Sequence, residues 1–149
     1  MSYDLMVFSP EAAPKTKPEF RAWYVTQTRW AEEHTYNDPA VATPALQAWL
    51  QEMEQTFPNM NGPKATDGHT SAYETDYSIG RAVIYAAFSW SLTEEANETA
   101  HRLARKHQVG FWDPSFEGPI LLPENGALRP MEEVDKPNTG TGKPWWKLW

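Results

Sequence analysis

The residues best suited to general acid–base chemistry lie close together between positions 67 and 76. Asp67, Glu74 and Asp76 supply carboxylates there, and His69 supplies an imidazole that titrates near neutral pH. Two carboxylates held in different surroundings can act as an acid and a base. The spacing does not require such a mechanism, because an acidic loop serves equally well as a surface that pairs with lysine or arginine of a protein partner.

Four residues with metal-binding side chains lie between positions 32 and 38: Glu32, Glu33, His34 and Asp38. The histidines of the chain are nevertheless scattered, and none belongs to an HExxH pair. Neighbouring carboxylates near the end of a helix are usually solvated. The sequence therefore predicts neither a metal site nor a cofactor.

Motifs for nucleotide binding or nucleophilic catalysis are also missing. The Gly-Thr-Gly-Lys run at 140–143 lacks the first glycine of a phosphate-binding loop, a preceding strand and a following helix. The serines at 71, 78, 89 and 91 have no nucleophile-elbow context, and the chain contains no cysteine. We therefore predict no catalytic residue, and the chain is expected not to be an enzyme.

The overall composition suits one folded domain. The chain has 149 residues, of which 40% are hydrophobic and 13% aromatic, enough to fill a core. Its formal net charge of −7 and sequence pI of about 5.0 argue against a protein that binds nucleic-acid phosphates. The acidity suits a basic protein partner, although acidity also maintains solubility by itself.

The expected location is the cytoplasm, without membrane association. No apolar run approaches the roughly 20 residues that span a bilayer, and no secretory signal is visible at the N-terminus. The lack of cysteine excludes disulfides and agrees with a cytosolic protein.

The secondary structure is clearest between 76 and 114, which is predicted to form strand, tight turn, strand, helix and strand. The run at 82–90 is rich in β-branched and aromatic residues, which is typical of a central strand buried on both faces. Gly80-Arg81 is the predicted turn, because glycine adopts positive φ without steric cost. Thr93 is the predicted N-cap of the helix, and a short strand at 109–112 follows it.

The N-terminal half is predicted to form one strand and two helices. Tyr3, Leu5 and Val7 of the strand face one side, while Met6 and Phe8 face the other. The first helix opens with a capping box at Thr16 and frays near 32–34; its aromatic face comprises Phe20, Trp23, Tyr24 and Trp30. Packing against the sheet explains that face better than an aromatic ligand cage does. The second helix opens at Thr43-Pro44 and carries a buried stripe: Leu46, Trp49, Leu50, Met53 and Phe57.

The order β, α, α, β, β, α, β predicts an α/β (α+β) domain. Without one extra helix, it is the ferredoxin-like βαββαβ order. We expect a single domain over residues 1–123. Residues 124–149 are rich in proline and glycine and are expected to form an extended tail.

Four short segments of the sequence resemble a known group of proteins. These segments are similar to small acidic bacterial proteins that look like immunity proteins, and they read YDLMVF, TDYSIGRAVIYAAFSW, VGFWDPS and, at the end of the chain, KPWWKLW. Such proteins are encoded beside polymorphic toxins delivered by type VI or contact-dependent secretion. The resemblance implies a stoichiometric inhibitor that occludes the active site of its cognate toxin in the cytosol.

In that interpretation, carboxylates pair with basic residues of the toxin and aromatic side chains anchor the interface. The candidate carboxylates are Glu32, Glu33, Asp38, Glu52, Glu54, Asp67, Glu74 and Asp76, and the candidate anchors are Trp145, Trp146 and Trp149.

Two other classes of function stay open. One is a small enzyme or ligand-binding domain, with a pocket between the sheet and the long loop at 59–74, near His69 and Tyr73. The other is an adaptor protein whose C-terminal tryptophans dock on a larger assembly, although the same tryptophans can instead fold back onto the domain.

Overall fold

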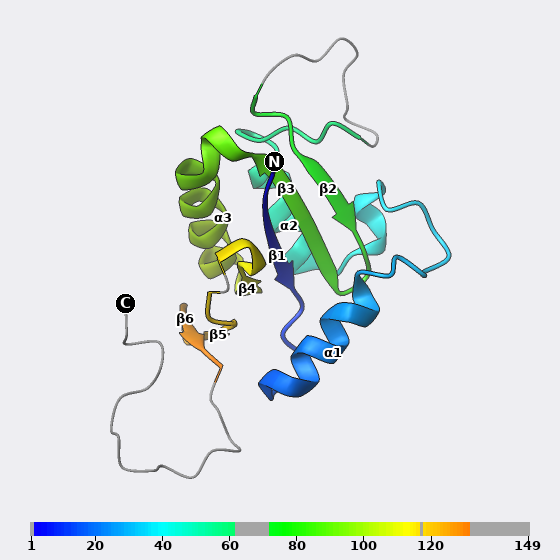
Figure 1. Ribbon diagram of the computed structural model, residues 1–149, viewed down its shortest axis with the longest axis vertical. Coiled ribbons are helices and arrows are strands. Elements are labelled where there is room, and N and C mark those ends of the chain that lie inside the picture. The colour runs from blue at the N-terminus through cyan, green and yellow to red at the C-terminus, as the bar shows by residue number, and fades with distance from the viewer. Residues whose placement is uncertain (1, 62–71, 117, 132–149) are drawn as a thin grey trace.

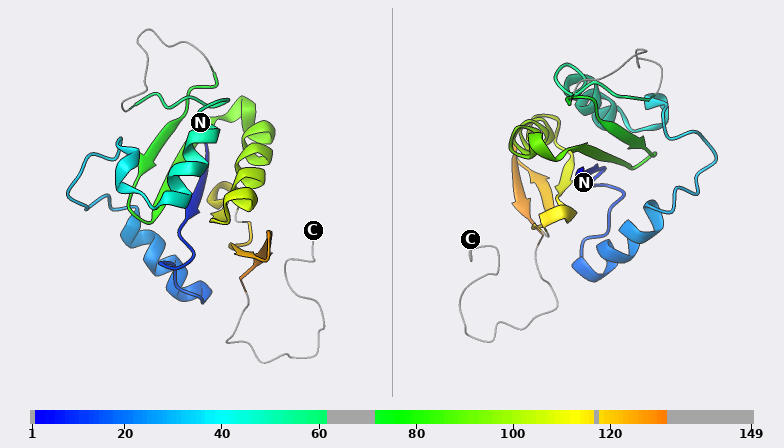
Figure 2. Two further views of the ribbon diagram at one scale, coloured as in Figure 1. Left: turned by 180° about the vertical axis from the view of Figure 1, so that it is seen from behind. Right: turned by 45° about the horizontal axis from the view of Figure 1, so that its top comes forward.

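A computed structural model of the chain describes residues 2–61, 72–116 and 118–131. In these residues the strands form one six-stranded antiparallel sheet in the order β2-β3-β1-β4-β5-β6. Helices α2 and α3 pack on one face of the sheet, and α1 packs on the other (Figures 1 and 2). The strands are β1 (Ser2–Phe8), β2 (Asp76–Ile79), β3 (Val83–Ser89), β4 (Gly110–Trp112), β5 (Leu121–Glu124) and β6 (Ala127–Pro130); the helices are α1 (Lys17–Gln27), α2 (Pro44–Met53) and α3 (Thr93–His107), with 3-10 turns η1 (Pro39–Val41), η2 (Trp90–Leu92) and η3 (Pro114–Phe116). The predicted α+β class and the predicted order of elements through β4 are confirmed.

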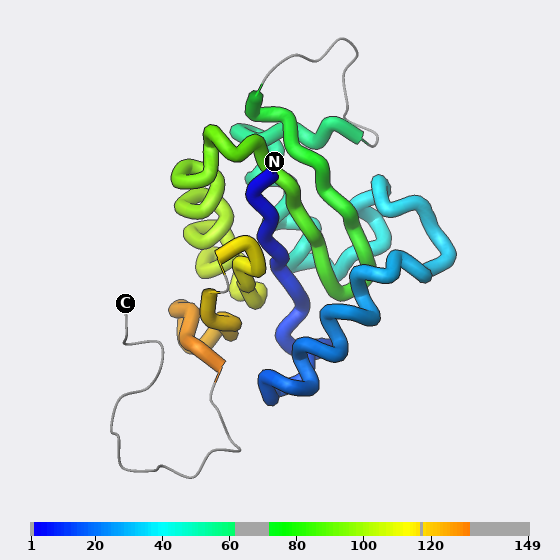
Figure 3. Tube along the Cα trace, in the orientation of Figure 1, coloured from blue at the N-terminus to red at the C-terminus, as the bar shows by residue number. Residues whose placement is uncertain are grey.

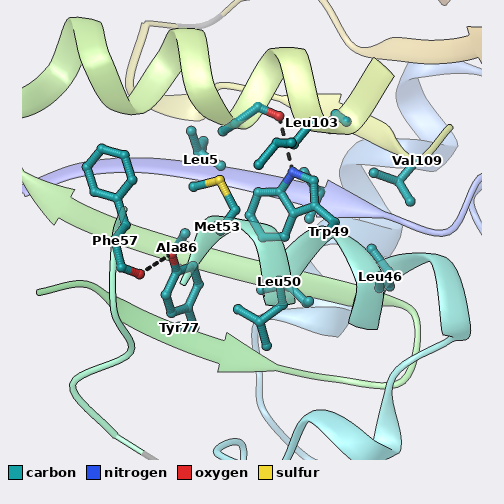
Figure 4. Close-up of a cluster of buried hydrophobic side chains, with 14 of the residues drawn as sticks. Leu5, Leu46, Trp49, Leu50, Met53, Phe57, Tyr77, Ala86, Leu103 and Val109 are labelled. Atoms are coloured by element: carbon teal, nitrogen blue, oxygen red, sulfur yellow. Dashed lines mark hydrogen bonds between the residues drawn. The ribbon is translucent and has the colours of Figure 1, made fainter. Parts of the chain in front are cut away.

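The larger core lies between the sheet and the pair α2 and α3. The predicted burial of the α2 stripe is confirmed, because all five members are at most 1% exposed, although α2 ends at Met53 and Phe57 lies beyond it. The Trp49 indole donates a hydrogen bond from Nε1 to the Ala100 carbonyl (3.1 Å), which ties α2 to α3 (Figure 4). Tyr77 of β2 similarly donates from its hydroxyl to the Phe57 carbonyl (2.8 Å). Polar groups on these aromatic residues are therefore satisfied inside an apolar layer.

The smaller core lies under α1. Met6 and Phe8 of β1 point to this side, as the alternation of the strand predicts, and both are fully buried. Phe20 of α1 packs on the rings of Phe8 (4.9 Å between centroids) and Trp112 (5.4 Å). Most of the aromatic face of α1 thus serves packing.

Several local predictions about element ends are wrong. Helix α1 ends at Gln27, before the predicted fraying near 32–34. Helix α1 begins as predicted, with Thr16 at the N-cap position, but the Thr16 side chain does not cap it, because its hydroxyl donates to the Glu19 carboxylate (3.1 Å). Thr93 is the first residue of α3, and its hydroxyl donates to the Trp90 carbonyl. The turn between β2 and β3 falls where predicted, but Gly80 does not adopt the positive φ that we expected of it.

The predicted boundary at residue 123 is also wrong. It cuts through β5, and β5 and β6 form a hairpin that extends the sheet from the β4 side. Asn125 and Gly126 form its two-residue turn with φ of 51° and 82°, the positive values that a type I′ hairpin turn needs. The remainder of the predicted tail, from residue 132, lies outside the described residues.

Among the residues that the structure describes, no helix has both the length and the apolar character needed to cross a membrane.

Gly110 is predicted to be intolerant of any side chain. A Cβ at this position would lie 2.2 Å from two ring carbons of Phe8, and that ring is itself enclosed by Phe20 and Trp23. We expect Gly110→Ala to lower the free energy of unfolding by about 1–3 kcal/mol, the usual cost of overpacking, measured by chemical denaturation.

Gly118→Ala is the matched control, because the nearest atom to its added Cβ would be 3.8 Å away. Equal stability of the two alanine variants would show that the Phe8 ring is free to move aside.

Candidate functional site

Helix α1 covers only one end of its face of the sheet. The side chains of β1 on that face pass from buried Phe8 and Met6 to half-buried Asp4 and exposed Ser2. Among the described residues, none of the helices α1, α2 and α3 covers this side of the sheet at the end where β1 begins and β3 ends (Figure 3). We call this surface the open sheet face and define it by Ser2, Asp4, Asp76, Ser78, Tyr85, Ala87 and Ser89.

Two carboxylates flank one small residue on the open sheet face. Asp4 of β1 and Asp76 of β2 are both registered opposite Ala87 of β3. Since directly opposed residues lie about 5 Å apart, the two aspartates are about 10 Å from each other. Within the described part of the chain, neither of them takes part in an ion pair.

Asp4 is held in place by hydroxyl groups. The Tyr85 hydroxyl donates to Oδ2 (2.7 Å) and the Ser2 hydroxyl donates to Oδ1 (2.7 Å). Asp76 accepts a hydrogen bond from the Asn61 amide (3.0 Å). Asp4 is therefore oriented by two hydroxyl donors, and both carboxylates have lone pairs left for a further donor.

A cavity of about 270 Å³ lies where the end of α1 meets the open sheet face. Its lining consists of Tyr24, Thr28, Trp30, Asp76, Ser78, Tyr85 and Ala87, and we call it the α1 pocket. Burial raises the pKa of Tyr85, and its hydrogen bond to Asp4 and the neighbouring Tyr24 raise it further, so the phenol stays protonated at neutral pH. The described residues that line this pocket thus combine aromatic rings, hydroxyls and one carboxylate without a cation.

Trp30 reaches the α1 pocket through an unusual backbone. Its φ is 52°, in the left-handed region that a bulky side chain seldom adopts. Such a conformation costs about 1–3 kcal/mol, which the surrounding packing must offset. The indole meets Tyr36 (5.0 Å) and Tyr85 (6.2 Å) edge to face, and this packing holds the ring against the sheet.

Of the carboxylates predicted to bind a partner, those between 32 and 38 lie on the loop that joins α1 to η1 and contacts the β2–β3 turn. Glu32 accepts hydrogen bonds from the Arg81 amide (3.1 Å) and from the His34 ring, so it fastens the loop to the β2–β3 turn. The Thr35 carbonyl, followed by Glu32, raises the pKa of His34. Glu33 is exposed, and Asp38 caps η1 by accepting from the Ala40 amide (2.9 Å).

The predicted carboxylates of α2 lie on the other side of the sheet. Glu52 accepts hydrogen bonds from Lys106 (2.7 Å) and His107 (2.9 Å) of α3, which lower its pKa. Glu54 is half-buried at the end of α2, where its charge contributes to the raised pKa of Tyr77. These two residues therefore do not join Asp76 in one surface.

The structure describes only one of the remaining candidates for partner binding, Glu74, which is half-buried just before β2. The following candidates lie outside the described residues: Asp67, His69, Trp145, Trp146 and Trp149. Tyr73, expected near a loop pocket, donates to Glu95 of α3 (3.1 Å) and packs on Phe57. Asp4 is not among the predicted site residues, because its place in an apolar strand gives no sign that the cover by α1 ends before it.

A second concave region runs along α3 on the opposite face. The Tyr3 hydroxyl donates to Asp113 (2.6 Å) and accepts from the Asn97 amide (2.9 Å). Burial raises the pKa of Asp113, whereas burial and Arg105 lower the pKa of His101. A cavity of about 490 Å³, the α3 groove, is lined by Asn97, His101, Phe111, Asp113, Phe116, Gly118, Pro119 and Leu121. No sequence motif signalled it, because the polar residues come from three separate segments.

Among the described residues, no cluster of three or more histidine and carboxylate side chains is arranged to hold a metal ion. Comparisons with known protein families, with curated proteins and with solved structures found no match.

His101 is predicted to make the stability of the fold depend on pH. Its pKa is lower in the folded than in the unfolded state, so the unfolded chain binds the proton more readily. Stability should therefore fall as the pH drops through about 6.5, the ordinary pKa of histidine.

We expect the free energy of unfolding to decrease less in the His101→Gln variant than in the parent when the pH is lowered from neutral to mildly acidic. Urea denaturation at each pH measures this free energy in both proteins. Comparing the two proteins cancels the contributions of Asp113 and the other groups. Identical pH profiles would contradict the assignment of this effect to His101.

Proposed function

We propose that the chain is an immunity protein that binds a basic secreted toxin in the cytosol and occludes its active site. The observation that carries this proposal is the open sheet face, where Asp4 and Asp76 stand on either side of Ala87 beside the α1 pocket. A surface of fixed carboxylates and aromatic rings complements the lysines and arginines that surround the substrate site of a toxin acting on nucleic acid or nucleotides.

The charge of the whole chain supports the same partner. A formal net charge of −7 speeds association with a basic protein and disfavours nucleic acid as the ligand. Glu33 and Asp38 are exposed on the loop that packs on the β2–β3 turn and add to the acidic surface of the chain. The sequence segments that resemble small acidic immunity proteins agree with a basic protein as the partner.

Pre-organisation is the physical advantage of this surface. Asp4 is already oriented by two hydroxyl donors, and Trp30 is held by two neighbouring rings. Groups that are ordered before binding lose little conformational entropy when a partner arrives, so more of the interaction energy appears as affinity.

We also propose that the scaffold is a ferredoxin-like unit with additions. Its strands would be β2-β3-β1-β4, all antiparallel, with α2 and α3 on one face as its two helices. Helix α1 would then be the extra helix, and the β5–β6 hairpin would be a further addition to the sheet.

The α3 groove favours one alternative function, the binding of a small ligand. It joins an apolar wall, including Phe111 and Leu121, to the Asn97 amide, the His101 ring and the Asp113 carboxyl. Apolar cavities with a few convergent polar groups are the usual form of ligand sites.

The test is affinity capture of the full chain from its native cells at moderate salt, with identification of bound proteins by mass spectrometry. We expect one basic protein in near-stoichiometric amount, toxic when it is produced alone. Asp76→Lys should weaken capture at least tenfold, which is about 1.4 kcal/mol, because it places a like charge against the partner.

Glu98→Lys is the charge-matched control. Glu98 is exposed on α3 and borders the concave region there, so its reversal should leave capture unchanged. Loss of capture in this control, with normal capture by Asp76→Lys, would move the contact to the α3 side. The absence of any stoichiometric partner would overturn the proposal.

A further inference from the structure

We infer that the α1 pocket receives one arginine side chain of the partner protein, with the guanidinium group placed between Trp30 and Asp76. This inference rests on the proposed function and specifies the chemistry of the same surface. It concerns a single anchoring contact, of the kind that supplies a large share of the energy in many interfaces.

The walls of the pocket suit a cation. Tyr24, Trp30 and Tyr85 contribute rings, and the ring planes of Trp30 and Tyr85 stand at 75° to each other. Two rings at such an angle form an aromatic corner. Aromatic faces attract cations electrostatically, and tryptophan does so most strongly.

The acceptors of the pocket suit a donor-rich group. Asp76 supplies a carboxylate, and Ser78 lies two residues further along the same strand, on the same face. The Tyr85 hydroxyl commits its proton to Asp4, so its oxygen presents lone pairs to a ligand. No described residue of the lining is a lysine or arginine that would compete for these acceptors.

The floor of the pocket leaves room for a side chain to enter. Ala87 stands between Asp4 and Asp76, and its single methyl group does not fill the space between the two carboxylates. A larger residue there would separate Asp76 from the aromatic corner. The volume of about 270 Å³ suits one long side chain and excludes a folded segment.

Arginine fits this combination better than lysine does. Its guanidinium is planar, offers five N–H donors and stacks on aromatic rings, whereas the lysine ammonium is a compact and strongly hydrated charge. The pocket is lined by aromatic rings together with acceptors on β2 and β3. An anionic ligand is disfavoured, because both nearby acidic side chains would repel it.

The inference is tested by titrating the full chain with N-acetyl-arginine methylamide and following the tryptophan indole N–H signals by NMR. The matched probe is N-acetyl-citrulline methylamide, which has nearly the same shape but no charge. Trp30→Phe assigns the Trp30 signal. We expect a saturable shift of that signal with the arginine probe and about tenfold weaker binding of the citrulline probe.

Asp76→Asn should weaken binding of the arginine probe about tenfold, while Glu98→Gln should leave it unchanged. Unfolding measurements on each variant check that the fold is kept. The inference is overturned if the two probes bind equally, or if the arginine probe produces no saturable shift of Trp30 up to its solubility limit.

These outcomes are distinguishable from failure of the proposed function. If a basic partner is captured through Asp76 but the arginine probe does not bind, the arginine assignment is wrong and the immunity proposal stands. If the arginine probe binds Trp30 but no toxin is captured, the pocket chemistry stands and the immunity proposal is wrong.

Discussion

The structure depends on the burial of β1 from both sides. Its position in the middle of the sheet, between β3 and β4, places alternate side chains into two separate cores. Tyr3, Leu5 and Val7 enter the core under α2 and α3, while Met6 and Phe8 lie beneath α1. A shift of one residue in its register would exchange these sets, so both cores fix the same pairing. That pairing is also what aligns Asp4 with Ala87 and Asp76.

The two concave regions of the molecule follow from the same alternation. Tyr3 and Asp4 are consecutive, so their side chains leave β1 on opposite faces. Tyr3 joins Asn97 and Asp113 beside the α3 groove, and Asp4 joins Tyr85 beside the α1 pocket. Because the sheet separates them, the two regions can be altered independently, and changes on one face report on that face alone.

The sequence was sufficient where a signal is local and periodic. The alternation in β1 and the buried stripe of α2 were predictable, because each depends on spacing within one element. The charge of Asp76 makes it a candidate for partner binding from the sequence alone. Its position across Ala87 from Asp4 depends on the register of three strands, which the sequence does not display. The β5–β6 hairpin was misread because its prolines suggested a tail, although prolines are tolerated in edge strands and Asn125-Gly126 is a strong hairpin signal. The pairing of Glu52 with Lys106 and His107 of α3 depends on tertiary packing, which the sequence does not display.

The central claim is that the open sheet face, and not the α3 side, meets the partner. Carboxyl-group footprinting tests this most directly: exposed aspartates and glutamates are labelled in the free protein and in its complex, and mass spectrometry measures the change at each residue. The account predicts strong protection of Asp76, together with Glu33 or Asp38, and unchanged labelling of Glu94 and Glu98 on α3. Protection of Glu94 and Glu98 with unchanged labelling of Asp76 would contradict it.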